Sequence, residues 1–319
     1  MLSEFELIRR YFNRPARSAL LGVGDDAALV KAGPGMALAV STDMLLEGRH
    51  FAAGTEPRAL GHKALAVNLS DMAAMGATPR WATLALALPQ ADQAWLAAFT
   101  AGLHALADRY EVDLIGGDTT RGSLAIAITI LGEVPAERAL LRSGARVADE
   151  IWVSGSLGGA ALALAHVQGR VELTAQDAAQ AAARLNTPEP RVALGQRLCG
   201  IASSAIDISD GFAGDLQHVL ESSSVGAQVR YASLPRFAAF ARLADPQREA
   251  DCVLSGGDDY ELLFTAAPAR RAELEALGVK LDIALARVGF IRAGEPKLEL
   301  LDAASRPMPH AGGFDHFRT

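Results

Sequence analysis

The chain has 319 residues, of which 50% are hydrophobic and 21% charged, and its formal net charge is −7. A chain of this length and apolar content can bury a large core and suggests roughly two domains. The acidic balance argues against a protein that binds nucleic acid through a concentrated basic surface, so we expect no nucleic-acid partner.

The first half of the sequence predicts alternating helices and strands. Residues 3–12 predict a helix, because Ser3 and Glu6 have capping-box spacing and the apolar residues fall on one face. We then expect a strand at 37–40 that runs into Ser41, a helix over 57–75 ended by Gly76, a strand at 82–88, a helix over 92–110 and a strand at 124–130.

The location of the protein is predicted from what these segments lack. No apolar run approaches the ~18 residues that cross a bilayer, and the N-terminus does not resemble a signal peptide. The two cysteines, Cys199 and Cys252, are too few for a disulfide framework and favour a reducing compartment. We therefore expect a cytoplasmic protein that does not bind membranes.

The polar, aperiodic stretch 135–150 predicts a domain boundary. We expect an α+β domain at residues 1–140 and an α/β domain at residues 148–319. In the second domain we expect a strand, glycine turn and helix from Ile151, helices over 174–185 and from Arg191, a strand ending at Ile206, a helix over 212–222, a strand in DDYELLFT and a helix over 268–277. The predicted fold class is therefore two-domain α/β.

Aspartates recur beside glycine at the ends of apolar segments, and we expect turns to carry them. The segments are GVGDDAAL, STDML, NLSDMAAMGA, LIGGDTT, IDISDGFAGDL and SGGDDYEL. Any one aspartate is more often a turn or N-cap residue than a ligand, and Asp215 fits the first turn of its helix. Several together repel one another, by about 4 kcal/mol for a pair ~4 Å apart at an effective dielectric of 20, unless cations lie between them.

The chemistry of these side chains indicates which cation they would bind. Oxygen donors without a cysteine or histidine cluster select magnesium, manganese or calcium over zinc or copper. Magnesium completes its shell with water and phosphate oxygens, which indicates nucleotide chemistry. The sequence contains no Walker-type GxxxxGK[ST], no dinucleotide-binding GxGxxG and no protein-kinase HRD and DFG set. A non-catalytic divalent-metal-binding module is the alternative, although EF-hand spacing is absent.

Eight motifs in order resemble the thiamine-monophosphate kinase family over essentially the whole chain. They are GDDAAL, STDML-EG-HF, KALAVNLSDMAAMGA, GGDTTRG, RSGA, IDISDG, SGGDDYELLFT and GGFDHF. The resemblance implies the fold of the aminoimidazole-ribonucleotide synthetase superfamily, with an N-terminal α+β dimerisation domain, a C-terminal α/β domain and a homodimer. It also implies transfer of the γ-phosphoryl of ATP to thiamine monophosphate with several magnesium ions. Another kinase or synthetase of the superfamily is the nearest alternative.

The resemblance assigns site residues to the matching positions of this chain. The implied metal ligands are Asp26, Ser41, Thr42, Asp43, Asp71, Asp118, Asp207 and Asp210. The implied ATP contacts are Gly117, Asp118, Arg142, Ser209 and Tyr110, and the implied substrate contacts are His50, Asp258 and Phe314. Asp258 stands where the family usually has Glu, and Phe314 where it usually has Trp or Tyr.

Three of these residues also have structural interpretations that stay open. His50 fits a surface loop, Arg142 a solvated linker, and Phe314 a seal of the C-terminus onto the core. No general base is expected in the site, because the second pKa of a phosphate monoester lies at about 6 and leaves the acceptor ionised at pH 7. The expected mechanism is direct in-line transfer between phosphates bridged by magnesium, without a phosphoenzyme.

Overall fold

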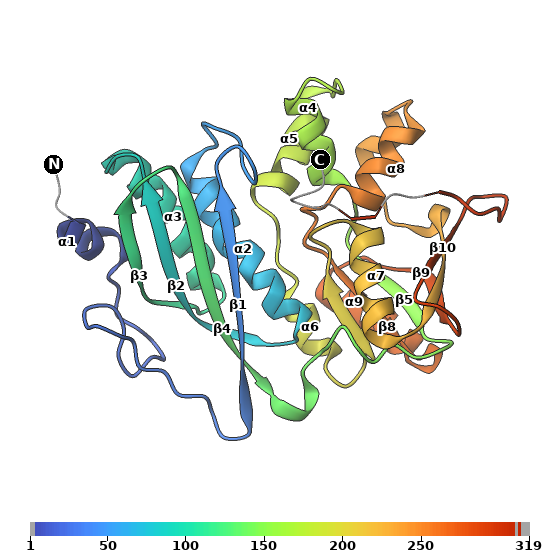
Figure 1. The fold of residues 1–319 in the computed structure, drawn as a ribbon, viewed down its shortest axis with the longest axis horizontal. Helices are drawn as coiled ribbons and strands as arrows, with labels where there is room; N and C mark the ends of the chain where they lie inside the picture. Colours follow the sequence, from blue (N-terminus) through green and yellow to red (C-terminus); the bar gives the residue numbers. More distant parts are fainter. Residues whose placement is uncertain (1–3, 310–311, 314–319) are drawn as a thin grey trace. The chain divides into compact units, whose positions relative to one another are not determined.

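The computed structural model describes residues 4–309, 312 and 313, and the chain divides into two compact units. The first unit comprises the residues up to Met72 and Ala77–Glu137, and the second comprises Ala73–Gly76 and the residues from Arg138 onward. Each unit combines one sheet with helices (Figure 1). The predicted α/β fold class is confirmed.

The first unit is built on a four-stranded sheet with the order β1-β4-β2-β3. Its strands are β1 (Met36–Leu46), β2 (Thr78–Leu88), β3 (Asp113–Arg121) and β4 (Ala125–Pro135). Its helices are α1 (Glu4–Leu7), the π-helical η1 (Ile8–Phe12), α2 (Pro57–Ala74) and α3 (Gln93–Arg109), followed by the 3-10 turn η2 (Ala136–Arg138). Strand β4 is antiparallel to β1 and β2, whereas β3 runs parallel to β2.

Helices α2 and α3 cover one face of this sheet (Figure 1). Side chains alternate along β1, so that Ala39 and Leu45 are buried while Leu38, Val40, Met44 and Leu46 are exposed. The same alternation places Ser41 and Asp43 on the face of the buried residues and Thr42 on the exposed face. The sheet therefore has one packed face and one open face that carries apolar side chains.

Several of the aspartates expected in turns lie in strands or helices instead: Asp71 lies in α2, and Asp207 is the last residue of a strand of the second unit. The strand predicted at 37–40 continues to Leu46, because β1 pairs with β4 along its whole length, and Asp43 lies within it. Asp118 lies in β3, a strand that the sequence did not predict. The expectation that turns carry these residues is wrong. For Asp43 and Asp118 the reason is that ladder pairing with a neighbouring strand extends β1 and β3 past their apolar residues.

The second unit is built on a six-stranded sheet with the order β10-β7-β9-β5-β8-β6. Its strands are β5 (Glu150–Ser154), β6 (Ser204–Asp207), β7 (Gly226–Arg230), β8 (Leu262–Ala266), β9 (Leu285–Arg292) and β10 (Leu298–Leu301). Its α-helices are α4 (Gly159–Val167), α5 (Ala175–Asn186), α6 (Val192–Leu198), α7 (Phe212–Ser223), α8 (Pro246–Ser255) and α9 (Arg271–Leu281). Short 3-10 turns are η3 (Tyr231–Ser233), η4 (Ala238–Arg242) and η5 (Pro268–Arg270).

The core of the second unit lies between this sheet and its helices. Ile151 of β5, Phe212 of α7 and Leu263 of β8 are each fully buried in one apolar cluster. Packing of this kind holds the strand ends, and the turns that follow them, in fixed positions. Within the described part of the chain, no helix is both long and apolar enough to cross a membrane.

Candidate active site

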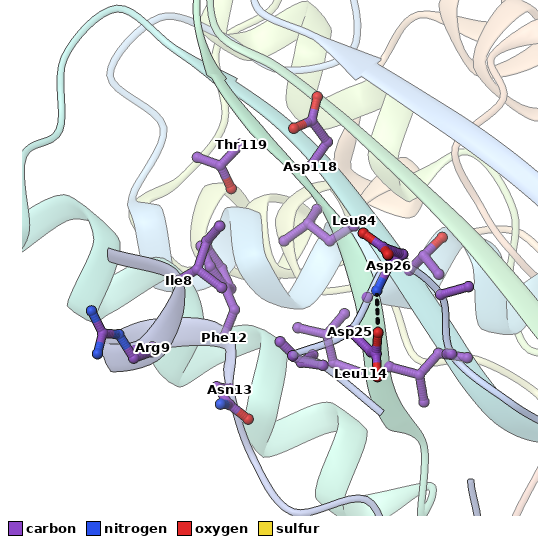
Figure 2. A pocket seen from close by; sticks show the side chains of 18 residues that line it. Ile8, Arg9, Phe12, Asn13, Asp25, Asp26, Leu84, Leu114, Asp118 and Thr119 are labelled. Carbon is purple, nitrogen blue, oxygen red and sulfur yellow. Dashed lines mark hydrogen bonds between the residues drawn. The ribbon is translucent and has the colours of Figure 1, made fainter. Parts of the chain in front are cut away.

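A cavity of about 820 Å³ opens in the first unit, beside the parallel strands β2 and β3. Asp26, Gly117 and Asp118 all line it, so the structure brings together two predicted metal ligands and a predicted ATP contact. Figure 2 shows Ile8 and Phe12 of the N-terminal helical segment facing the loop that carries Asp25 and Asp26. Both Asp26 and Asp118 are exposed, so their carboxylates are open to a ligand.

Gly117 brings bare backbone to the wall of this cavity. Its φ is +149°, and a Cβ built on it would lie 1.9 Å from the carbonyl oxygen of Leu84. Any side chain at this position would collide with β2, whose Leu84 lies opposite Gly117 in the parallel ladder. The close approach of β2 and β3 at the cavity therefore requires glycine.

A second group of predicted ligands lies where β1 meets α2. The hydroxyl of Ser41 donates a hydrogen bond of 2.5 Å to Oδ2 of Asp71, which joins the strand to the helix. Asp43 lies on the same face of β1 as Ser41. Thr42 points to the other face, where its hydroxyl lies 2.8 Å from that of Thr129. The structure therefore brings Ser41 and Asp71 together and directs the Thr42 side chain away from them.

These two groups are separated along the sheet. Asp43 lies on β1 and Asp118 on β3, the two edge strands of the order β1-β4-β2-β3. Three strand spacings of ~4.8 Å place them about 14 Å apart along the sheet. Nowhere in residues 4–309, 312 and 313 do three or more His, Cys, Asp or Glu side chains form a group that could hold a metal ion.

His50, a predicted substrate contact, is held in a tight turn after β1. The backbone N–H of Leu46 donates to Nδ1 of His50 at 3.0 Å, which assigns the proton of a neutral imidazole to Nε2. Nζ of Lys63 donates to the carbonyl oxygen of His50 at 3.3 Å, and Lys63 is only 2% exposed. The sequence analysis did not predict a role for Lys63. A lysine among the apolar residues of KALAVNL could have indicated a buried, paired side chain.

Tyr110, the weaker ATP candidate, ends helix α3 and does not line the cavity. Its ring lies 5.2 Å from the guanidinium carbon of Arg109. Arg142 is exposed in the second unit, where its carbonyl oxygen accepts from the hydroxyl of Ser223 at 3.3 Å. Tyr110 is therefore separate from the cavity that Gly117 and Asp118 line.

In the second unit, two predicted motifs lie side by side. The N–H of Asp258 donates to the carbonyl oxygen of Ser209 at 2.8 Å, and the N–H of Tyr260 donates to that of Ile208 at the same distance. Ile208 in turn donates to the carbonyl oxygen of Glu261 at 2.8 Å. The loop after β6 and the loop before β8 are therefore joined, which brings Ser209 and its neighbours to Asp258.

The loop before β8 has an unusual backbone. Asp258 and Tyr260 have φ of 59° and 50°, a left-handed conformation that costs of order 1 kcal/mol or more for residues other than glycine. The hydroxyl of Tyr260 donates to Oδ1 of Asp258 at 2.8 Å and fixes that carboxylate. Strain that the surrounding hydrogen bonds hold in place is typical of functional sites.

Asp215 fixes the turn that carries Ser209 and Asp210. It lies in the first turn of α7, as predicted, and is 2% exposed. Its Oδ2 accepts the backbone N–H groups of both Ser209 and Asp210 at 3.0 Å. Burial raises the pKa of Asp215 to about 8, with further contributions from Asp207 and Asp210. These carboxylates therefore lie close enough to repel one another, and the sequence did not reveal that Asp215 holds the turn.

Two buried carboxyls follow Asp258 in the chain. Glu261 is 1% exposed and accepts hydrogen bonds of 2.6 Å from Arg184, Arg191 and Ser154. Burial alone would raise the pKa of Glu261, but the two arginines outweigh it and lower the pKa. Asp259 accepts the N–H of Gly158, and burial raises its pKa to about 8. None of these partners was predicted, because their sequence separations give no pattern.

The end of the chain passes the same turn. A Cβ built on Gly214 would lie 2.5 Å from Cα of Gly313, and one built on Gly313 would lie 3.2 Å from the carbonyl oxygen of Asp210. The segment before the predicted aromatic contact therefore packs against the Asp210 turn. Phe314 itself lies outside the described residues.

Comparisons with known proteins identify relatives over the full length of the chain. Residues 24–134 match the family "AIR synthase related protein, N-terminal domain". Thiamine-monophosphate kinase of Escherichia coli (strain K12) is 44% identical over 330 residues, covering 99% of this chain and 98% of the relative. The crystal structure of thiamine-monophosphate kinase from Stenotrophomonas maltophilia K279a is 45% identical, with a TM-score of 0.84 over 89% of this chain and 91% of that one. AaThiL complexed with AMPPCP and TMP is 27% identical, with a TM-score of 0.79 over 92% of both chains.

Proposed function

The chain belongs to the thiamine-monophosphate kinase family and is a kinase, and we propose that it makes thiamine diphosphate by direct in-line transfer of the γ-phosphoryl of ATP to thiamine monophosphate. Relatives at 40–44% identity over 99% of the chain bear this name, which disfavours a non-catalytic metal-binding module. One structural relative is a complex with AMPPCP and TMP, ligands that match a nucleotide and a phosphorylated acceptor.

The observation that carries the proposal is the lining of the 820 Å³ cavity. Two exposed carboxylates, Asp26 and Asp118, lie beside the bare backbone of Gly117. Backbone of this kind allows a phosphate to approach closely, and the carboxylates supply oxygen ligands for its cation. The proposed ATP contacts are Gly117 and Asp118 here, with Tyr110 in the same unit and Ser209 and Arg142 in the second.

The proposed metal ligands fit magnesium by the chemistry of their donors. All are carboxylate or hydroxyl oxygens: Asp26, Ser41, Thr42, Asp43, Asp71 and Asp118 in the first unit, and Asp207 and Asp210 in the second. Burial raises the pKa of Asp215 to about 8, and the neighbouring Asp207 and Asp210 raise it further. A cation bound by Asp207 and Asp210 would relieve the repulsion among these carboxylates. Bound magnesium ions supply charge neutralisation between the two phosphates.

The protein's own residues then bind and orient the acceptor. We propose that His50, Asp258 and Phe314 contact thiamine monophosphate. The neutral His50 offers an Nε2–H donor, and Asp258 is held by the Tyr260 hydroxyl. No side chain has to remove a proton, because the acceptor phosphate is ionised at pH 7.

The assembly and location are part of the same proposal. We propose a cytoplasmic homodimer formed through an N-terminal domain of residues 1–140, with residues 148–319 completing the substrate site. The exposed Leu38, Val40 and Met44 of β1 give the first unit an apolar open face that a second copy would bury. Cys199 and Cys252 are both free thiols, which fits a reducing compartment.

The test is an assay of the purified protein with MgATP and thiamine monophosphate, in which ADP and thiamine diphosphate are measured. We expect equal amounts of both products, and no diphosphate with metal present would refute the proposal. Asp43→Asn should lower turnover at least about a hundredfold while the thermal unfolding midpoint stays near that of the wild type. Near-normal turnover in that variant would show that Asp43 is a strand residue without a metal role.

A further inference from the structure

A second cavity, of about 320 Å³, opens in the second unit and is rich in arginine. Arg230 at the end of β7, Arg271 at the start of α9 and Arg287 of β9 line it, together with Glu150 of β5. Three arginines and one glutamate give this lining a formal charge of +2, in a chain whose net charge is −7. The cavity is therefore a local exception to the acidic surface.

This cavity lies at the opposite end of the six-stranded sheet from the predicted ligands of the second unit. Strand β8 pairs with β5 so that Ala266 lies opposite Glu150, and it pairs with β6 so that Leu262 lies opposite Asp207. Four residues of β8 therefore separate the two ends, about 13 Å at ~3.3 Å per residue. The charged side chains of the cavity are therefore too far away to contact Asp207, Ser209 or Asp258.

Two of the arginines are held rigidly by a buried carboxylate. Glu150 is 4% exposed, and it accepts hydrogen bonds from Arg287 at 3.0 Å and from Nε of Arg271 at 3.3 Å, with a further one from Arg271. A guanidinium has five N–H donors, so both arginines keep donors that Glu150 does not use. Their side chains are 45% and 53% exposed, which leaves those donors accessible.

Neutralising Glu150 does not account for the third arginine. Two guanidiniums already pair with the one carboxylate. Within the described part of the chain, the guanidinium of Arg230 makes no ion pair or hydrogen bond, yet it lines the same cavity. A surplus of oriented guanidiniums is the arrangement that binds phosphate, because each fork can donate two parallel hydrogen bonds to an oxyanion.

An aromatic ring lies beside these donors. Phe290 lines the cavity and is 46% exposed, and it lies opposite Glu150 in the β5–β9 ladder. An exposed phenyl ring offers a face for stacking a planar ring. We propose that this cavity is a second binding site, separate from the kinase reaction, for a small molecule that combines a phosphate group with a planar ring. The volume suits a ligand of mononucleotide size.

Binding of two probes by isothermal titration calorimetry tests the proposal. The probes are inorganic phosphate and uridine monophosphate, titrated in EDTA so that magnesium-dependent binding at the candidate active site does not contribute. Arg230→Ala is the informative variant, because it unpairs no buried charge. Arg58→Ala is its matched control, an exposed arginine of the first unit.

We expect the wild-type protein to bind uridine monophosphate more tightly than inorganic phosphate, because of the ring. Arg230→Ala should weaken both probes by about tenfold or more, and Arg58→Ala by less than about twofold. Phe290→Ala should weaken uridine monophosphate and leave inorganic phosphate unchanged. Kinase turnover of Arg230→Ala, measured without either probe, should equal that of the wild type.

Three results would overturn the proposal. The first is the lack of saturable binding of either probe at millimolar concentration. The second is equal weakening by Arg230→Ala and Arg58→Ala, which would indicate a general charge effect. The third is unchanged affinity of Phe290→Ala for uridine monophosphate, which would refute the ring contact and leave a site for inorganic phosphate.

Discussion

Replacing Asp215 tests whether this buried carboxyl holds the Ser209–Asp210 turn in place. Both backbone N–H groups converge on the single oxygen Oδ2 at 3.0 Å. Asp215→Ala removes the acceptor, and two hydrogen bonds of about 1 kcal/mol each give a loss of about 2 kcal/mol. At pH 4 in EDTA, where the carboxyl is close to neutral in the folded and the unfolded states, we expect the free energy of unfolding to fall by that amount. At neutral pH we expect kcat/KM to fall by up to about 30-fold because the turn is displaced.

Asp215→Asn is the matched control. Its amide oxygen can occupy the position of Oδ2 and accept both N–H groups, and the side chain is neutral. At pH 4 the wild-type carboxyl, whose folded-state pKa is raised to about 8 by burial and by Asp207 and Asp210, is neutral, and the unfolded chain binds nearly as many protons as the folded one. We therefore expect Asp215→Asn to unfold in urea, at pH 4 in EDTA, with nearly the wild-type free energy, and to keep most of its kinase activity at neutral pH.

The two variants separate positioning from charge. If Asp215→Asn loses as much activity as Asp215→Ala while both stay folded, the negative charge matters and the residue acts as a ligand. If Asp215→Ala keeps wild-type activity and stability, the two hydrogen bonds do not hold the turn, and the argument is refuted.

Three further substitutions test other parts of the structure. Gly117→Ala should raise the KM for ATP at least about tenfold, because its Cβ would lie 1.9 Å from the carbonyl oxygen of Leu84. Gly122→Ala is the control and should leave this KM unchanged, because its Cβ would make only a 3.5 Å contact. Equal KM values for the two variants would contradict the argument. Arg191→Ala should lower the free energy of urea unfolding by about 3–5 kcal/mol, because Glu261 is 1% exposed and would keep Arg184 alone; a loss below 1 kcal/mol would count against it. Burial raises the pKa of Asp259 from 3.8 to about 8, so the folded state holds this proton longer than the unfolded state. The contribution of Asp259 to the free energy of unfolding is full below about pH 4 and is lost as the pH rises to 8, by up to about 1.4 kcal/mol per pH unit. Asp259→Asn should flatten this dependence of the unfolding free energy on pH, measured in EDTA. An unchanged slope would refute the assignment.

The sequence predicted the elements that carry their own pattern. Helix α3 has the expected bounds because Asp92 caps it, accepting the N–H groups of Ala94 and Trp95. Strand β4 shows the alternation that the residues from Leu124 to Ile130 predicted. Strand β3 was missed because Gly116, Gly117 and the polar residues that follow break the apolar pattern. Its conformation is stabilised by pairing with β2, which no local property of the residues encodes.

The candidate site shows the same division between local and long-range information. Motif resemblance supplied Asp26, Gly117 and Asp118, and the structure places all three at one cavity. It supplied Ser209, which the loop before β8 contacts, but not the two arginines that pair with Glu261 next to that loop. Arg184 and Arg191 contact Glu261 across 77 and 70 residues, and they lie in segments without a motif. Contacts of that separation form only when the whole unit folds, so single-sequence patterns do not reveal them.

Asp258, at the position where the motif resemblance leads us to expect glutamate, has a left-handed backbone conformation. Its φ of 59° is left-handed, and Asp enters that region more readily than Glu because a short polar side chain can bond locally. Asp258 makes such a local hydrogen bond, because its Oδ1 accepts from the hydroxyl of Tyr260, two residues further along the chain. A shorter side chain reaches less far toward a substrate but relieves strain in a loop that also holds Ser209. An aspartate at this position therefore extends less far toward a substrate than a glutamate would. Its bond to Tyr260 also holds the loop that carries this proposed substrate contact beside Ser209.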